Sequence, residues 1–225
     1  MRVLPVLLCV AACTGGTTDD SDPGIVAGQT TRAQLFNATA DVPVFDALVP
    51  DGPVVAAGLD QGTGSEVVDL PVAGPLSLRG DGFDLTTDAL SLDPDTRYSW
   101  LLAGDGGDHP WRSVALADDF PEPIPGVAHI RFIIAHPDVA DGARVFVDGA
   151  VLAGGLGYDV EWPTTFMAVA AGPGHPIRLD AQDDAFDAIF GDEDFEDDGL
   201  YTAVIHARAG GGEGVRMKLT RHPRE

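Results

Sequence analysis

Cysteine is almost absent from this chain. Only two of its 225 residues are cysteines, Cys9 and Cys13, and both lie in the first thirteen positions. The remainder of the sequence therefore has no thiol for a disulfide, a catalytic thiolate or a cysteine metal site. Its stability must come from a packed core alone.

Basic residues and long apolar runs are scarce as well. Thirteen lysines and arginines stand against 36 acidic residues, which gives a formal net charge of −23. Such a field repels phosphate backbones and disfavours nucleic-acid binding; the charge is best interpreted as a highly solvated surface. Beyond the N-terminus no segment approaches the roughly 20 apolar residues of a membrane-spanning helix.

The N-terminus carries the sharpest local pattern that is present. Arg2 precedes the apolar stretch Val3–Val10, which is too short to span a bilayer but suits the core of a signal peptide. The following Ala11-Ala12-Cys13 resembles a bacterial lipobox, in which the cysteine is acylated and becomes the first residue of the mature protein. An ordinary secretory signal cleaved nearby and a cytosolic protein with a buried apolar N-terminus are the alternatives.

These residues predict an exported protein. Residues 1–12 are expected to be a lipoprotein signal peptide, and residues 13–30 the lipidated Cys13 followed by a flexible tether of small and polar residues. The predicted location is the bacterial cell envelope, at the outer membrane or the cell surface, with the lipid as the anchor.

The rest of the sequence alternates with a period of two. Val215, Met217 and Leu219 are separated by polar residues, and Ile130, Phe132 and Ile134 are placed on one face beside Arg131. Such alternation predicts half-buried strands. The abundance of glycine (28) and proline (17) fits many short strands joined by turns. Asp148-Gly149 is expected to form the two-residue turn of a hairpin, because both residue types tolerate positive φ.

Two related segments flank a proline-rich break. Sliding the chain by 97 residues matches Asp51-Gly52 with Asp148-Gly149, and an offset of 103 matches Tyr98 with Tyr201. An internal duplication is therefore predicted, with repeats of about a normal domain size. The expected fold class is all-β, with two tandem immunoglobulin-like β-sandwich domains of six or seven strands each.

The predicted boundaries follow from this duplication. The first repeat covers residues 31–117, an acidic proline-rich linker covers 118–126, and the second repeat covers 127–225. One segment is ambiguous: residues 183–190 have the apolar spacing of a helix, whereas the matched Phe83-Asp84-Leu85 has that of a strand.

The second repeat opens on residues that resemble a known bacterial extracellular family. The strand and turn HIRFIIAHPD at 129–138, the hairpin VFVDG at 145–149 and the late Tyr201-Thr202 are similar to the tandem repeats of domain of unknown function 4397. The first repeat keeps Asp41, Asp51-Gly52 and Tyr98 but lacks the histidine-proline stretch. The resemblance implies a surface-anchored β-sandwich, often in tandem, and it brings no activity and no catalytic residues.

An acidic run at 192–198 is the most evident candidate for metal chemistry. Carboxylates of Asp192, Asp194, Glu196 and Asp198 could coordinate Ca²⁺, and the spacing from Asp194 begins like a calcium-binding loop. The closing acid of such a loop would fall at Ile205, within a predicted strand. A solvated loop is therefore the preferred interpretation and calcium binding the alternative.

Other candidate site residues are few. Trp162, which precedes Pro163, is predicted to be the most exposed of the three tryptophans and is the candidate for stacking on a ligand such as a sugar ring, whereas Trp100 is predicted to be core. The histidines are scattered, and Ser65 lacks the setting of a nucleophile elbow. No catalytic residue, metal or cofactor is assigned.

These observations favour a non-enzymatic cell-envelope lipoprotein that displays β-sandwich modules to an envelope protein or a polysaccharide. A carbohydrate- or calcium-binding accessory protein is the alternative, and a hydrolase built on a β-sandwich scaffold is the third possibility. Expected partners are the membrane, through the N-terminal lipid, and the displayed ligand, but not nucleic acid.

Overall fold

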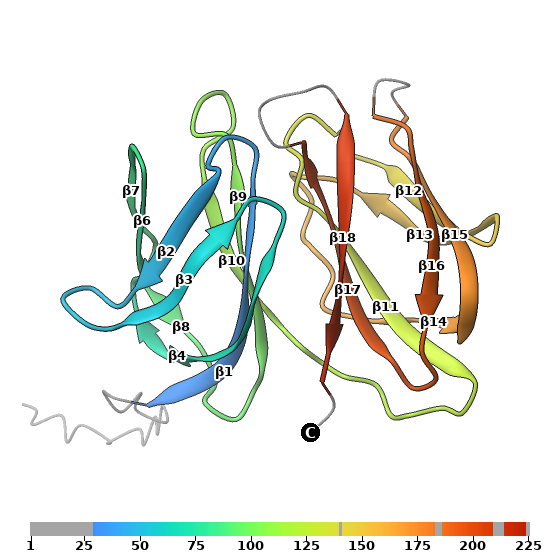
Figure 1. The fold of residues 1–225 in the computed structure, drawn as a ribbon, viewed down its shortest axis with the longest axis horizontal. Coiled ribbons are helices and arrows are strands. Elements are labelled where there is room, and N and C mark those ends of the chain that lie inside the picture. Colours follow the sequence, from blue (N-terminus) through green and yellow to red (C-terminus); the bar gives the residue numbers. More distant parts are fainter. Residues whose placement is uncertain (1–28, 140, 183–185, 209–213, 224–225) are drawn as a thin grey trace, which may run out of the picture.

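The computed structural model describes residues 29–139, 141–182, 186–208 and 214–223, and these residues form eighteen strands and no helix (Figure 1). The all-β prediction is confirmed. None of the described residues forms a helix long and apolar enough to cross a membrane. The signal peptide, Cys13 and nearly all of the predicted tether lie outside the described residues.

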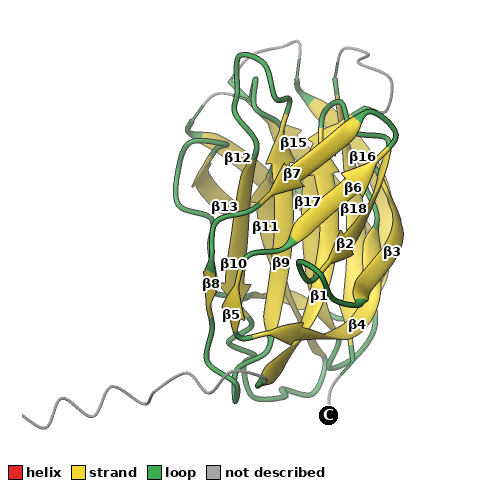
Figure 2. Ribbon diagram, turned by 90° about the vertical axis from the view of Figure 1, so that its left-hand side faces the viewer, coloured by secondary structure: helices red, strands yellow, loops and turns green. Residues whose placement is uncertain are grey.

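The first half of the chain builds two four-stranded sheets that face each other (Figures 1 and 2). One sheet has the order β10 (Arg112–Ala117), β9 (Tyr98–Gly104), β1 (Thr30–Thr39), β4 (Gly64–Pro71). The other has the order β3 (Val54–Asp60), β2 (Val44–Leu48), β6 (Ser77–Gly80), β7 (Phe83–Thr86). The short strands β5 (Ala73–Gly74) and β8 (Leu90–Ser91) pair beside them.

The second half repeats this arrangement. One sheet has the order β14 (Met167–Ala170), β11 (Val127–Ile134), β17 (Leu200–Ala207), β18 (Val215–His222). Its partner has the order β13 (Ala150–Leu156), β12 (Ala143–Val147), β15 (Gly172–Asp180), β16 (Ala188–Phe195). In both halves the first strand pairs in parallel with a late strand, β1 with β9 and β11 with β17. Each sandwich thus has four strands in each sheet, more than the six or seven expected.

Local geometry also matches between the halves. Asp51 and Asp148 both have positive φ, 56° and 53°, in the turns that follow β2 and β12. At Asp148-Gly149 both residues have positive φ, so the predicted two-residue hairpin turn is confirmed. The hydroxyls of Tyr98 and Tyr201 each accept a hydrogen bond from a backbone N–H five residues upstream, at Asp93 and Glu196 respectively.

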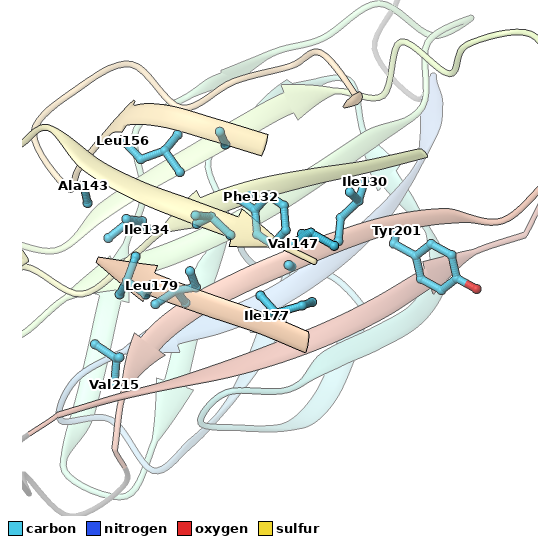
Figure 3. Close-up of a cluster of buried hydrophobic side chains, with 14 of the residues drawn as sticks. Ile130, Phe132, Ile134, Ala143, Val147, Leu156, Ile177, Leu179, Tyr201 and Val215 are labelled. Carbon is cyan, nitrogen blue, oxygen red and sulfur yellow. The ribbon is translucent and has the colours of Figure 1, made fainter. Parts of the chain in front are cut away.

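Each sandwich has its own apolar core. Trp100, Phe45 and Leu78 are buried between the sheets of the first sandwich. Figure 3 shows the second core, where Phe132 of β11, Val147 of β12 and Ile177 of β15 converge. Alternate residues of each strand point into these cores, as period-two patterning requires.

A third cluster of buried apolar residues lies between the two sandwiches. The sheet containing β1 and β9 packs against the sheet containing β11 and β17, with Phe36, Leu101 and Ile133 among the apolar residues between them. The four sheets therefore form consecutive layers (Figure 1). We call the contact between the two inner sheets the seam.

The seam corrects one sequence-based expectation. The strand that contains Ile130, Phe132 and Ile134 is not half-buried, because the opposite face, including Arg131, is also fully buried. The alternating residues of β17 are buried on both faces in the same way. Edge strand β18 keeps the expected pattern, with Val215 buried and Arg216 and Lys218 exposed.

The linker and the ambiguous segment 183–190 can also be compared with the sequence-based expectations. The linker at 118–126 contains no helix or strand. In the ambiguous segment, residues 188–190 begin strand β16, so the helical alternative is wrong there, and residues 183–185 lie outside the described residues.

Candidate functional site

Trp162 is not an exposed platform. Its side chain is 2% exposed and lies in the seam, where the guanidinium of Arg112 stands 4.4 Å from the ring centroid. The prediction that it is the most exposed tryptophan is wrong, because the second sandwich turns this loop onto the first. Trp100 is fully buried in the first core, as predicted.

The acidic run does not form one solvated loop. Residues 192–195 belong to edge strand β16, where alternation directs successive carboxylates to opposite faces. Asp194 accepts a hydrogen bond from the N–H of Gly174 at 2.9 Å, and Glu196 pairs with Arg221 at 2.7 Å. No group of three or more potential ligands that could hold a metal ion occurs among the described residues.

The seam holds a buried polar cluster that the sequence analysis missed. The Nη2 atom of Arg131 donates to Asp118 at 2.5 Å and to Ser99 at 2.6 Å, and its Nε donates to Thr202 at 3.0 Å. Arg97 approaches the other oxygen of Asp118 at 3.6 Å. These residues come from both sandwiches and from the linker, so the cluster ties the two halves together. The sequence feature that indicates this cluster is Arg131, which lies in the middle of an otherwise apolar strand.

Burial governs the electrostatics of this cluster. Desolvation raises the pKa of Asp118 and lowers that of Arg131, although each stabilises the charge of the other. His222 lies beside them with Nε2 2.7 Å from the Thr202 hydroxyl, and burial followed by repulsion from Arg131 and Arg97 lowers its pKa to about 3. The cluster therefore contains a neutral histidine, two arginines and one aspartate. Its buried contacts favour a structural role.

A polar cavity of about 630 Å³ opens beside this cluster, near the C-terminal end of β18. Glu66 of β4 lines it from the first sandwich, and Asp197, Asp198 and Arg221 line it from the second. Its wall mixes both signs of charge.

A smaller pocket of about 140 Å³ lies at the other end of the first sandwich. We call it the Trp111 pocket; it is lined by Asp41, Val42, Pro43, Asp81, Gly82, Phe83 and Trp111. The indole N–H of Trp111 donates to a carboxylate oxygen of Asp41 at 3.3 Å, and the rings of Trp111 and Phe83 meet nearly perpendicular at 4.8 Å. Trp111 is half-buried, the most accessible of the three tryptophans.

The loop before Trp111 packs closely on its indole ring through Gly106. A Cβ on Gly106, which has φ of 66°, would lie 2.4 Å from the indole ring, so only glycine lets the loop cover the ring this closely. Asp105 organises the same loop, because its Oδ1 accepts hydrogen bonds from the N–H groups of Gly107 and His109. The side chain that lines the pocket is thus fixed by its own loop.

The second sandwich supports this loop from the far side. The Tyr158 hydroxyl donates to the carbonyl of Pro110 at 3.3 Å, and Arg112 donates to the carbonyl of Tyr158 at 2.7 Å. His109 lies 3.5 Å from a carboxylate oxygen of Asp138. The Trp111 pocket belongs to the first sandwich, but the loop that positions it is clamped by the second.

His136 lies near the same end of the molecule as the Trp111 loop. The segment His136-Pro137-Asp138 follows β11 as a turn, as expected, and burial lowers the pKa of His136. Its ring packs against Phe186 rather than against a possible nucleophile. Ser65 lies on β4, where its hydroxyl accepts a hydrogen bond from the N–H of Leu35.

Comparisons with known proteins add little to this geometry. No family model matches the chain, and no curated protein is similar to it, so the resemblance to domain of unknown function 4397 stays a prediction. Among solved structures, the chain is similar to CBMbc, of family CBM26, from Eubacterium rectale Amy13K in complex with maltoheptaose. The identity is 9%, the match covers 87% of this chain and 99% of that one, and the TM-score is 0.23. At that TM-score the likeness carries no argument about function.

Proposed function

We propose that this protein is a non-enzymatic, lipid-anchored envelope module whose two sandwiches act as one rigid body that presents a binding surface. The observation that carries the proposal is the seam. Strands β9 and β17 are buried on both faces throughout, and β1 and β11 along most of their length, so the two halves are held in one fixed relation. A rigid body suits display, because no ordering of the halves is needed when a partner binds.

The direction of the chain supports anchoring at one end and binding at the other. Strand β1 begins at Thr30, close to the predicted tether, and runs to Thr39, and the Trp111 pocket begins two residues later with Asp41. Ten strand residues span about 30 Å. A lipid on Cys13 would therefore hold one end of the first sandwich near the membrane and direct the pocket away from it.

We further infer that the halves arose by duplication and are immunoglobulin-like. The common strand order, the paired turns at Asp51 and Asp148, and the equivalent hydroxyl bonds of Tyr98 and Tyr201 support the duplication. A tyrosine near the start of a strand that binds upstream backbone resembles the tyrosine corner of immunoglobulin-like sandwiches. The four-plus-four strand order is a variation on their ABED and CFG sheets. It also fits the proposed relationship to domain of unknown function 4397.

The displayed partner is proposed to be an envelope protein or a polysaccharide. The carbohydrate-binding alternative now depends on Trp111, because Trp100 and Trp162 are buried. The calcium alternative loses support, since two of its four carboxylates already have partners: Asp194 accepts a backbone hydrogen bond and Glu196 pairs with Arg221.

Metabolic labelling with an alkyne fatty acid in a bacterial host tests the anchored module. The full chain should incorporate label, the Cys13→Ala variant should lose it, and the Cys9→Ala control should keep it. Label that persists in Cys13→Ala, or an intact chain that retains Met1 in the cytosol, contradicts the anchor. Reproducible turnover in an unbiased hydrolase screen contradicts the non-enzymatic role.

A further inference from the structure

The Trp111 pocket combines carboxylates and aromatic rings, and both kinds of group attract positive charge. Its polar side chains are the carboxylates of Asp41 and Asp81, and its aromatic side chains are Phe83 and Trp111. Carboxylates accept hydrogen bonds and attract positive charge, and aromatic faces attract cations through their quadrupole. The one side-chain donor, the Trp111 indole N–H, already binds Asp41. The pocket therefore offers acceptors and aromatic surface, but no free side-chain donor.

No described basic side chain forms an ion pair with either carboxylate of this site. Among the ion pairs between described residues, none involves Asp41 or Asp81, and both aspartates are exposed at the pocket rim. The net charge of −23 adds a long-range field that attracts cations and repels anions. A uronic acid or a phosphate is thus disfavoured as a ligand.

The pocket is built in advance and is small. Gly80 fits only as glycine, because a Cβ there would lie 2.3 Å from the carbonyl oxygen of Val44, and this close approach fixes the turn that carries Asp81 and Gly82 against β2. A volume of about 140 Å³ is well below the roughly 300–1,000 Å³ of sites for drug-sized ligands. The pocket thus has room for one compact group and not for a chain of rings.

The described residues at the equivalent positions of the second sandwich contact other protein side chains. The residue that corresponds to Asp41 is Asp138, and its carboxylate faces His109 at 3.5 Å across the seam. Phe186, which corresponds to Phe83, packs against His136. The second-sandwich residues at these positions thus contact histidines, whereas Asp41 and Phe83 of the first sandwich contact Trp111 and line a pocket.

We propose that the Trp111 pocket binds an organic ammonium group, held between the carboxylates of Asp41 and Asp81 and the rings of Trp111 and Phe83. This inference rests on the binding role proposed above and names the ligand chemistry of one site on the displayed surface. The clamp from Tyr158 and Arg112 keeps the Trp111 loop in the binding geometry.

Choline and its neutral isostere 3,3-dimethylbutan-1-ol are a matched pair of probes, because they differ in charge and hardly in shape. The full chain, purified in detergent at 0.15 M salt, is titrated with each by calorimetry and by tryptophan fluorescence. Choline should bind saturably in the millimolar range, and the neutral alcohol should bind at least tenfold more weakly. Equal binding of the two, or no saturable choline binding, overturns the proposal.

Variants locate the site. Asp81 is exposed and its carboxylate forms no ion pair with another described residue, so Asp81→Ala should weaken choline binding at least tenfold without changing the unfolding midpoint. Asp88→Ala removes the same charge from an exposed position outside the pocket and should have little effect at this ionic strength. Equal weakening by both variants would indicate a general field rather than a site, and would overturn the proposal.

N-acetylglucosamine and glucosamine complete the test. Glucosamine should bind and N-acetylglucosamine, which lacks the ammonium, should not. Saturable binding of N-acetylglucosamine alone would assign the pocket to a neutral sugar and overturn the ammonium proposal. It would leave the display role intact, which the labelling of Cys13 tests separately.

Discussion

The cores of the sandwiches and the seam between them are both closed to solvent, but they are built from different groups. Each core consists of apolar side chains such as Trp100 and Phe132. The seam combines an apolar half around Phe36 with a polar half around Arg131 and Asp118. The apolar half supplies attraction, whereas the polar half fixes one relative placement, since the hydrogen bonds from Arg131 to Asp118 and Ser99 require that placement.

A large destabilisation is expected at the charged pair of the seam. Asp118→Ala leaves the buried guanidinium of Arg131 without its partner, which should lower the free energy of unfolding by about 3–5 kcal/mol. Urea denaturation followed by circular dichroism measures the change. No core substitution removes a charge partner, so this mechanism is specific to the seam.

A double variant separates the pair from its desolvation cost. Burial raises the pKa of Asp118 and lowers that of Arg131, which disfavours the charged form of each. An apolar replacement of both residues should therefore be tolerated. Asp118→Ala with Arg131→Met should recover most of the stability lost in Asp118→Ala. A double variant as unstable as the single one would show that the pair itself supplies the stability.

Two phenylalanines compare the packing of the two regions. Phe36 in the seam and Phe132 in the second core are both fully buried, so Phe36→Ala and Phe132→Ala should each cost about 3–5 kcal/mol. Thermal and urea unfolding of both variants test this equality. A cost below about 1 kcal/mol for Phe36→Ala alone would mean that the seam is a loose contact.

Acid should weaken the seam through His222. Its pKa is about 3 in the folded protein and 6.5 when unperturbed, so between these values the unfolded chain binds a proton that the folded chain does not. Stability should therefore be full above pH 6.5 and fall as the pH is lowered toward 3. His222→Gln should flatten this fall, although His136 and His206, whose pKa values burial also lowers, contribute in the same direction. Equal slopes in His222→Gln and the parent chain would refute the assignment.

The smallest effect is expected where a similar ion pair is exposed. Glu196 and Arg221 approach to 2.7 Å, but both side chains are more than half exposed, so water screens the pair. Glu196→Gln should change stability by less than about 1 kcal/mol. A loss as large as that of Asp118→Ala would remove the distinction between buried and exposed pairs.

Much of the strand architecture could be predicted, because alternation and turn chemistry are local signals. The Asp148-Gly149 hairpin and the edge strand β18 follow directly from their residues. The burial of both faces of β11 and β17 could not be predicted in the same way. It depends on a second sandwich that packs against them, and the sequence of a strand does not specify what covers its second face.

The candidate site shows the same limit. Trp162 and Trp111 both lie in loops beside proline, and the exposure of each is decided by the other sandwich. Trp162 is folded into the seam, whereas Trp111 is held at a pocket by a loop that Tyr158 contacts. Aromatic residues in turns can be found in a sequence, but whether they are accessible is a tertiary property.

Pulsed electron–electron double resonance tests the rigid seam most directly. Spin labels at Asp84 of β7 and Asp192 of β16, both exposed and on the outer sheets, report the distance across all four layers once Cys9 and Cys13 are replaced by serine. One narrow distance distribution, broadened by Asp118→Ala, is the expected result. A broad distribution in the parent protein would show that the sandwiches move independently and would contradict the account.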